Sequence, residues 1–290
     1  MNFREKLSKG DFVTLAEMSS PKGVDIFDLV ANLRHLKSRI DTIIMPDMDS
    51  GVMHLGALAA GSVIRQQGLE PMIHVHGRDR NRISLQGDML SAHVLGIHNL
   101  LVVKGETMAN GDHPEATEVD DLDEKSLLVM IDSLLKGSDL AGFELKGTPD
   151  FFAGCQIPPV KDEAHLKELV AEAKQKVEAG AKFVVLSSLF DTEFYKAVIA
   201  AFKTLDVPVI ATVSMLKSVG MARYISINDP DARLAESTIV RIRKAKDREA
   251  ECIAIAGEMI QAVRNDIQGV KISALGWEDR LPAILDSAGL

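Results

Sequence analysis

Charged side chains follow several of the apolar runs in this chain. Glu17 lies near the end of the apolar run 12–18, and Lys104, Gly105 and Glu106 follow the run 99–103. Two carboxyl groups in a partly dry cavity can be tuned for proton transfer. The alternative is that such groups cap helices or pair with Arg and Lys, and the sequence leaves both interpretations open.

A second feature with chemical potential is the His-x-His pair formed by His74 and His76. Alternation along a strand places both side chains on one face. A zinc site needs three or four ligands, and the sequence offers no further candidates at suitable positions. We therefore expect hydrogen-bonding histidines and no metal site. The chain also contains no G-x-G-x-x-G, P-loop or G-x-S-x-G motif, which argues against the common Rossmann, NTPase and α/β-hydrolase sites.

The elements that must position these residues alternate regularly between short apolar runs and helical patterns. Fully apolar runs of this length are typical of strands that are buried on both faces of a parallel sheet. The predicted strands are residues 12–18, 42–45, 71–75, 99–103, 151–157, 183–186, 209–213 and 270–273. The predicted helices are residues 26–36, 54–66, 83–95, 124–136, 163–178, 192–205, 249–264 and 277–288, with an irregular helical stretch ending near residue 228.

Eight strand–helix units in 290 residues predict a single (β/α)8 barrel of the α/β class that spans residues 1–290, with a short helix at the N-terminus. In such a barrel the carboxyl ends of all strands surround one mouth, where chemistry is carried out. The predicted mouth residues are Glu17, Asp47, His76, Arg78, Arg80, Lys104, Glu106, Gln156, Ser187, Ser188, Ser214 and Ser273. The long acidic segment 107–122 is expected to be a functional loop.

Composition narrows the class of protein further. The net charge of −9 and the lack of a basic stripe argue against nucleic acid as a partner. No apolar run reaches the length of about 18 residues expected of a membrane-spanning helix. Cys155 and Cys252 form no metal-ligand pattern, and two cysteines in a chain of this size are typical of reduced thiols in a cytoplasm.

With these residues in view, the chain resembles the methylenetetrahydrofolate reductase family along nearly its whole length. The likeness is strongest to the subgroup found beside electron-transfer subunits in bacteria that use the acetyl-CoA pathway. The order and spacing of its segments are specific, although no single segment is. They are residues 12–17, 21–23, 77–82, 96–106, 149–152, 178–181, 190–191, 216–224 and 277–278.

The resemblance implies a barrel that holds FAD at its mouth and passes hydride to the one-carbon unit of a reduced folate. Glu17 is implied to protonate the folate nitrogen, and Glu106 to hold the pterin and stabilise the cation, so both are expected to be catalytic. The residues implied to bind substrate are Asp47, Glu106, Ser187 and Ser214. Those implied to bind the cofactor are His74, His76, Arg80, Lys104, Gly105, Glu106, Gln156 and Lys176.

Some contact positions depart from the family pattern. The fifth strand ends in Gln156 and two prolines where the family usually has Pro-Glu and then His, and Ser187 and Gln175 replace a family glutamine and arginine. One alternative is therefore a flavin-free relative that transfers a methyl group between a pterin and a corrinoid protein. Another is a subunit of an electron-transfer complex. We expect an oligomer, with NAD(P)H or a partner protein as electron donor.

Overall fold

Eight parallel strands form a closed barrel in the computed structural model, which describes all 290 residues. Each strand pairs with its neighbours in chain order, and the eighth strand pairs with the first. This confirms the predicted (β/α)8 architecture, and every predicted strand boundary lies within one residue of the observed one. The strands are β1 (Val13–Glu17), β2 (Thr42–Met45), β3 (Pro71–Val75), β4 (Asn99–Val102), β5 (Phe152–Ile157), β6 (Val184–Leu186), β7 (Val209–Ser214) and β8 (Gly269–Ser273).

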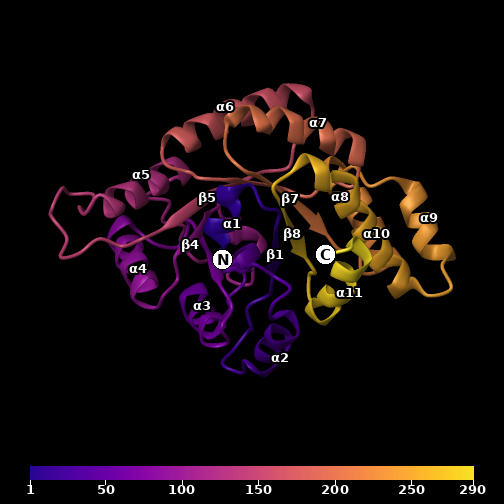
Figure 1. Cartoon of the computed structure of the whole chain (residues 1–290), viewed down its shortest axis with the longest axis horizontal. Coiled ribbons are helices and arrows are strands. Elements are labelled where there is room, and N and C mark those ends of the chain that lie inside the picture. Colours follow the sequence, from indigo (N-terminus) through magenta and orange to yellow (C-terminus); the bar gives the residue numbers. More distant parts are fainter.

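Helices surround this barrel in chain order, as Figure 1 shows from α2 round to α11. Many of them begin where a short polar side chain accepts a backbone N–H, such as Asn81, Asp123, Asp162 and Asp191. The helices are α1 (Phe3–Lys9), α2 (Phe27–Leu36), α3 (Ala57–Gln66), α4 (Arg82–Val94), α5 (Glu124–Leu135), α6 (Glu163–Glu178), α7 (Thr192–Phe202), α8 (Val219–Asn228), α9 (Glu236–Lys244), α10 (Arg248–Val263) and α11 (Leu281–Ala288). None of them combines the length and apolarity needed to cross a membrane.

The barrel has two separate apolar cores. A large core fills the space between the sheet and the surrounding helices. A smaller one fills the barrel interior and includes Phe3 and Leu7 from α1, both almost fully buried. Figure 1 shows α1 near the centre of the ring, next to the N-terminus. Because α1 packs into the interior core, a ligand site inside the barrel is expected at the opposite end, where the strands have their carboxyl ends.

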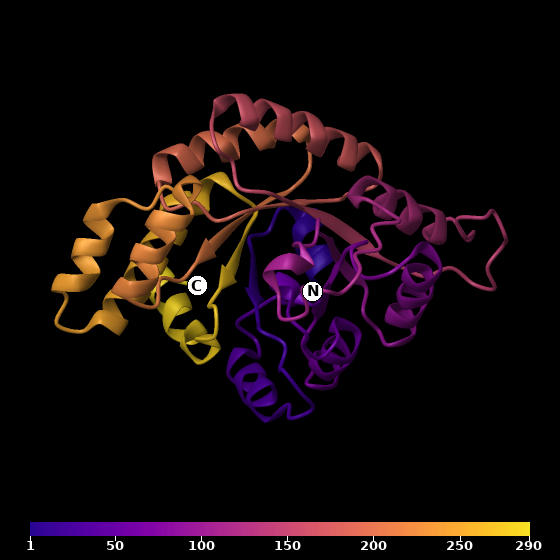
Figure 2. The same ribbon diagram turned by 180° about the vertical axis from the view of Figure 1, so that it is seen from behind.

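The region between residues 229 and 248 contains a helix that the sequence did not predict. Helix α9 packs on α8 and α10, and it lies at the outer edge of the molecule in Figures 1 and 2. Its polar face carries Arg241, which pairs with Glu258 (2.6 Å) and Glu251 on α10. The helix packs through the buried Ile239 and Ile242, and these ion pairs join it to α10 as well.

Candidate active site

A polar layer lies inside the barrel on top of the small apolar core. The carboxylate of Glu17 is its centre: Oε2 accepts a hydrogen bond from Lys271 Nζ at 2.7 Å, and Oε1 accepts one from Ser273 Oγ at 2.8 Å. Gln156 Oε1 lies 3.5 Å from the same Lys271 ammonium. The layer thus joins β1, β5 and β8 through one buried ion pair.

Strand register explains why these residues meet. Glu17 lies opposite Ser273 across the β1–β8 pair, and Ser273 lies opposite Ser214 across the β7–β8 pair. Lys271 precedes Ser273 by two positions, so both side chains point to the same face of the strand. Lys271 is only 4% exposed, so the free-energy cost of removing its charge from water must be offset by its attraction to the Glu17 carboxylate.

The charge state of Glu17 follows from this environment. Burial opposes ionisation of the carboxyl group, but the Lys271 ammonium and the two hydrogen bonds outweigh it and lower the pKa of Glu17 to about 2. At neutral pH Glu17 is therefore a carboxylate. That state suits the stabilisation of a cation better than the donation of a proton.

His74 from β3 completes the layer as a neutral ring. Burial lowers the pKa of His74 to about 4, and the nearby Lys271 acts in the same direction. Its Nε2 lies 3.9 Å from Glu17 Oε2 and has no hydrogen-bond partner. The hydroxyl of Thr212 is also buried without a partner. Buried polar atoms of this kind are commonly completed by water or a polar ligand.

A second cluster next to this layer consists of Asp47, His76 and Arg80. Asp47 Oδ1 accepts the Ala57 N–H at 2.9 Å, and Oδ2 accepts Arg80 Nη1 at 2.6 Å. The Nε2 atom of His76 lies 3.0 Å from the Asp47 carbonyl. These polar atoms connect the ends of β2 and β3 and the start of α3, so the cluster shapes the wall of the mouth.

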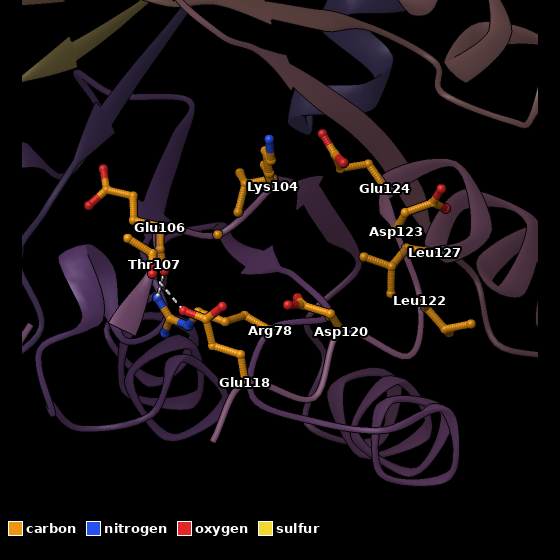
Figure 3. A pocket seen from close by; sticks show the side chains of 13 residues that line it. Arg78, Lys104, Glu106, Thr107, Glu118, Asp120, Leu122, Asp123, Glu124 and Leu127 are labelled. Atoms are coloured by element: carbon orange, nitrogen blue, oxygen red, sulfur yellow. Dashed lines mark hydrogen bonds between the residues drawn. The ribbon is translucent and has the colours of Figure 1, made fainter. Parts of the chain in front are cut away.

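The outer rim of the mouth is formed by the residues after β4. Lys104 and Glu106 are exposed, and Lys104 stands between Glu106 on one side and Glu124 on the other in Figure 3. Gly105 between them has a φ of +77°, and a Cβ there would meet the side chains of Arg78 and His76 at 3.3–3.4 Å. Glycine therefore allows the rim to lie directly over the His76 wall.

Arg78 fixes the backbone of this rim. Its guanidinium is 3% exposed and donates to the carbonyls of Glu106 (2.7 Å) and Met48 (2.9 Å), while two further bonds go to Asp79. The bond to the Glu106 carbonyl is visible in Figure 3. Arg78 therefore ties the loop after β4 to the turn after β2.

Asp49 lies in that turn and connects the two parts of the mouth. It lines a cavity of about 90 Å³ with Glu17 and Ser273, and a cavity of about 220 Å³ with His74 and Glu106. Partial desolvation of the carboxyl group raises the pKa of Asp49, and the nearby carboxylates Glu106 and Glu17 raise it further. Its neighbours Met48 and Ser50 both have left-handed backbone angles, a strained conformation that is concentrated at functional sites.

The remaining predicted residues lie at or near the same end of the barrel. Ser187 Oγ donates to the Ile157 carbonyl at 2.7 Å, and the Ser214 N–H donates to Ser188 Oγ at 3.1 Å. Lys176 on α6 is 8% exposed and pairs with Glu124 at 3.0 Å. Their predicted roles toward substrate and cofactor stay predictions.

Lys271 and Asp49 are the residues that sequence reasoning missed. A signal for Lys271 was present, because a lysine in the middle of a buried apolar strand requires a charged partner. Its partner Glu17 is 254 positions away in the chain, so only the closed barrel reveals the pair. Asp49 follows β2 in a run of polar and small residues that resembles an ordinary turn.

The mouth continues into a groove along α5 and α6. The cavity of about 220 Å³ over the mouth shares Lys104 and Glu106 with a second cavity of about 290 Å³. The second cavity shares Lys104 with a third cavity of about 610 Å³, which is also lined by Lys125 and Lys161. Lys104 lines all three cavities and is exposed, whereas Glu118, Asp120, Asp123 and Glu124 bring carboxylates to the same groove.

Comparisons with known proteins agree with this architecture. The family model described as methylenetetrahydrofolate reductase matches residues 2–289. No curated protein matches the chain in sequence.

Three solved structures have a similar fold at low sequence identity. An uncharacterized protein from Clostridium thermocellum, described as binding two copies of 5-methyl-5,6,7,8-tetrahydrofolic acid, is 11% identical, with a TM-score of 0.66 and coverage of 98% of this chain and 97% of that one. Ligand-free tryptophan synthase from M. tuberculosis is 13% identical (TM-score 0.53; coverage 99% and 94%). Phosphonopyruvate hydrolase with oxalate and Mg²⁺ is 12% identical (TM-score 0.55; coverage 99% and 85%). At these identities the likeness shows the fold alone.

Proposed function

Because the chain belongs to the methylenetetrahydrofolate reductase family, we propose that it binds a reduced folate at the barrel mouth and reduces its one-carbon unit. The proposed reaction converts 5,10-methylenetetrahydrofolate to 5-methyltetrahydrofolate. The observation that carries the proposal is the ionised Glu17 at the floor of the mouth, 2.7 Å from Lys271. The similar Clostridium thermocellum protein, described as binding 5-methyltetrahydrofolate, supports the choice of ligand.

Each residue of the mouth has a proposed role that follows from its position. Opening the five-membered folate ring creates an iminium cation, and the Glu17 carboxylate in a water-poor layer stabilises such a charge. Glu106 at the rim can accept hydrogen bonds from the N–H groups of a pterin. Asp47, with both carboxylate oxygens already used, supports the wall against which the ligand lies.

FAD is the proposed cofactor, and it would supply the hydride when bound. Lys104 and Gly105 would hold it at the junction of the groove, and Gln156 would meet it at the floor. Arg80, His76 and Lys176 already have protein partners, so we assign them to the walls of the site. NAD(P)H or a partner protein is the proposed source of electrons.

The proposal is tested with the purified protein under anaerobic conditions. We expect FAD to bind and the absorption spectrum of the flavin to shift. The isolated chain should then form 5-methyltetrahydrofolate from 5,10-methylenetetrahydrofolate when NADH, NADPH or dithionite is the reductant. Glu106→Gln should reduce turnover, whereas Glu115→Gln, an exposed carboxylate in the same loop, should not. Absence of product with all three reductants would contradict the proposal.

A flavin-free methyl transfer is the second candidate. It is favoured by the pairing of Lys176 with Glu124 and by the carboxylates that line the groove, Glu118, Asp120 and Asp123. Carboxylates repel the diphosphate of FAD. This candidate predicts methyl transfer from 5-methyltetrahydrofolate to cob(I)alamin with no flavin present. Tight binding of FAD by the purified chain would argue against it.

A further inference from the structure

The outer face of helix α4 carries a row of apolar side chains that points away from the barrel. The inner face of the helix is buried through Leu85 and Met89. On the opposite face, Ile83 is 77% exposed, Val94 is 83% exposed and Leu90 is 39% exposed. Contiguous exposed apolar surface on a globular protein marks a contact with another molecule.

This row has the same spacing when it is read in either direction. It consists of Ile83, Gly87, Leu90 and Val94, which we call the α4 stripe, and its members are separated by four, three and four positions. Side chains three or four positions apart lie on one face of a helix. Because the spacing is symmetric, a second stripe that runs antiparallel places Ile83 opposite Val94 and Gly87 opposite Leu90. The stripe is therefore complementary to a copy of itself.

We propose that the α4 stripe is the contact surface of a homodimer, in which the α4 helices of two copies pack antiparallel across a twofold axis. In such a symmetric contact the same surface serves both copies. Helix α4 lies on the outer ring of the molecule in Figure 1, so a second copy can approach it. The inference names the surface behind the expected oligomer, and it does not depend on the folate reaction.

The charges around the stripe favour a second copy in this orientation. The neighbouring Ser84, Gln86 and Ser91 are uncharged, so the centre of the contact contains no like charges, although each copy has a net charge of −9. Arg82 at the start of α4 pairs with Asp121 at 2.7 Å. The antiparallel arrangement brings Arg82 to the C-terminal end of the second α4, where the helix carbonyls carry a partial negative charge.

A fixed turn adds apolar surface beside the stripe. Phe143, which is 72% exposed, lies in the segment between α5 and β5. The Leu140 N–H of this segment donates to Gln86 Oε1 on α4 at 2.8 Å. The Asp150 N–H donates to His93 Nδ1 at 3.1 Å. The segment projects beyond α4 at the edge of the molecule in Figures 1 and 2. It therefore contributes to the area of about 800 Å² that a stable interface needs from each partner.

The first test is the oligomeric state of the full chain, measured by analytical ultracentrifugation over a range of concentrations. We expect a wild-type dimer with a dissociation constant of about 1 µM or tighter, in the range of interfaces of standard size. Leu90→Glu places two carboxylates at the centre of the contact and should raise this constant by about 100-fold or more. Ile227→Glu, at an apolar position on α8 that is 76% exposed, should leave the dimer intact. Gly87→Ala, which keeps the stripe apolar, should do the same.

A pair of introduced cysteines tests the antiparallel register. Positions 83 and 94 of different copies should lie close enough for a disulfide, whereas the two copies of either position should lie about 16 Å apart along the helix axis. Ile83→Cys/Val94→Cys should therefore form a covalent dimer on mild oxidation, and neither single variant should. The native Cys155 and Cys252 are buried, so they do not compete.

Three results would overturn the inference. One is a wild type that is still monomeric at about 100 µM, far above the expected dissociation constant, which would leave the stripe to a different protein. Another is a dimer that Leu90→Glu leaves intact while circular dichroism shows the variant to be folded, because the contact would then lie elsewhere. The third is cross-linking of Ile83→Cys alone as efficiently as the double variant, which would exclude the antiparallel register.

Discussion

The inner polar layer and the outer rim of the mouth both carry charged residues, but they hold them differently. In the layer, Glu17 and Lys271 form a buried ion pair with short contacts to neighbouring strands. At the rim, Lys104 and Glu106 are exposed and have no side-chain partner, while Arg78 holds only the backbone of Glu106. The charged groups of the layer are therefore already paired within the protein, whereas those of the rim are free to contact a ligand.

This difference indicates that the layer and the rim have different roles. Burial in the layer makes the pKa values of Glu17 and His74 depend on each other and on the nearby Lys271 charge, since charges interact strongly where water is scarce. Exposure at the rim screens charges and lets side chains move. We therefore expect substitutions in the layer to change stability and pH dependence as well as ligand binding, and substitutions at the rim to change ligand binding and turnover with little effect on stability.

The largest effect is expected from breaking the ion pair on one side. Lys271→Met leaves the Glu17 carboxylate buried without its partner, and removal of one member of a buried pair costs about 3–5 kcal/mol of stability. The double variant Glu17→Gln/Lys271→Met should recover most of that loss, because no buried charge remains. Urea unfolding of the single and double variants measures both values. Equal loss in the two proteins would show that the pair is not coupled.

The next largest effect is a pH dependence of stability that His74 creates. Burial lowers the pKa of His74 from 6.5 to about 4. Between these pH values the unfolded chain binds a proton that the folded chain does not, so stability falls as the pH falls. The loss amounts to about 3 kcal/mol between pH 6.5 and 4. Thermal unfolding should show a flatter pH profile for His74→Gln, and an unchanged one for His35→Gln at an exposed position on α2.

A smaller effect is expected where the loop after β4 meets the wall of the mouth. A Cβ on Gly77 would lie 2.0 Å from the Leu122 carbonyl, so Gly77→Ala must displace the loop and should cost about 1–3 kcal/mol. Gly87 on α4 has no atom within 4 Å of such a Cβ, and Gly87→Ala should stabilise the helix by about 0.5–1 kcal/mol. Unfolding experiments compare the two. A neutral Gly77→Ala would contradict the tight contact between loop and wall.

The smallest effect on stability belongs to the rim. Glu106→Gln and Glu115→Gln should each leave the free energy of unfolding within about 0.5 kcal/mol of wild type, because both side chains are exposed. Chemical denaturation checks this. A large loss in Glu106→Gln would mean that the rim, like the layer, has its charges engaged in the fold.

The barrel could be predicted from the sequence because its strands are continuous apolar runs that end at polar residues. Glu17 and Glu106 were both placed at the mouth on this basis, and the structure brings them to the same end of the barrel with Asp49 near both. The prediction did not extend to contacts between distant elements. Helix α9 packs on α8 and α10 and pairs Arg241 with α10, and Lys271 pairs with a carboxylate at the other end of the chain.

The charge state of Glu17 could not be predicted either. A carboxyl group at the end of a strand is equally compatible with an acid and with a carboxylate, and only its neighbours decide between them. Here a lysine and a serine on β8 decide it. The roles inferred from the family therefore require the three-dimensional neighbours of each residue before they can be stated as chemistry.

The central claim is that a reduced folate binds over the ionised Glu17 and against the Glu106 rim. Isothermal titration calorimetry of flavin-free protein with 5-methyltetrahydrofolate tests it most directly. We predict saturable binding to the wild type. The affinity should be lower by about tenfold or more in Glu106→Gln and Glu17→Gln, because each variant loses a hydrogen bond to a charged group. The affinity of Glu115→Gln should be unchanged. No saturable binding, or one affinity for all four proteins, would contradict the account.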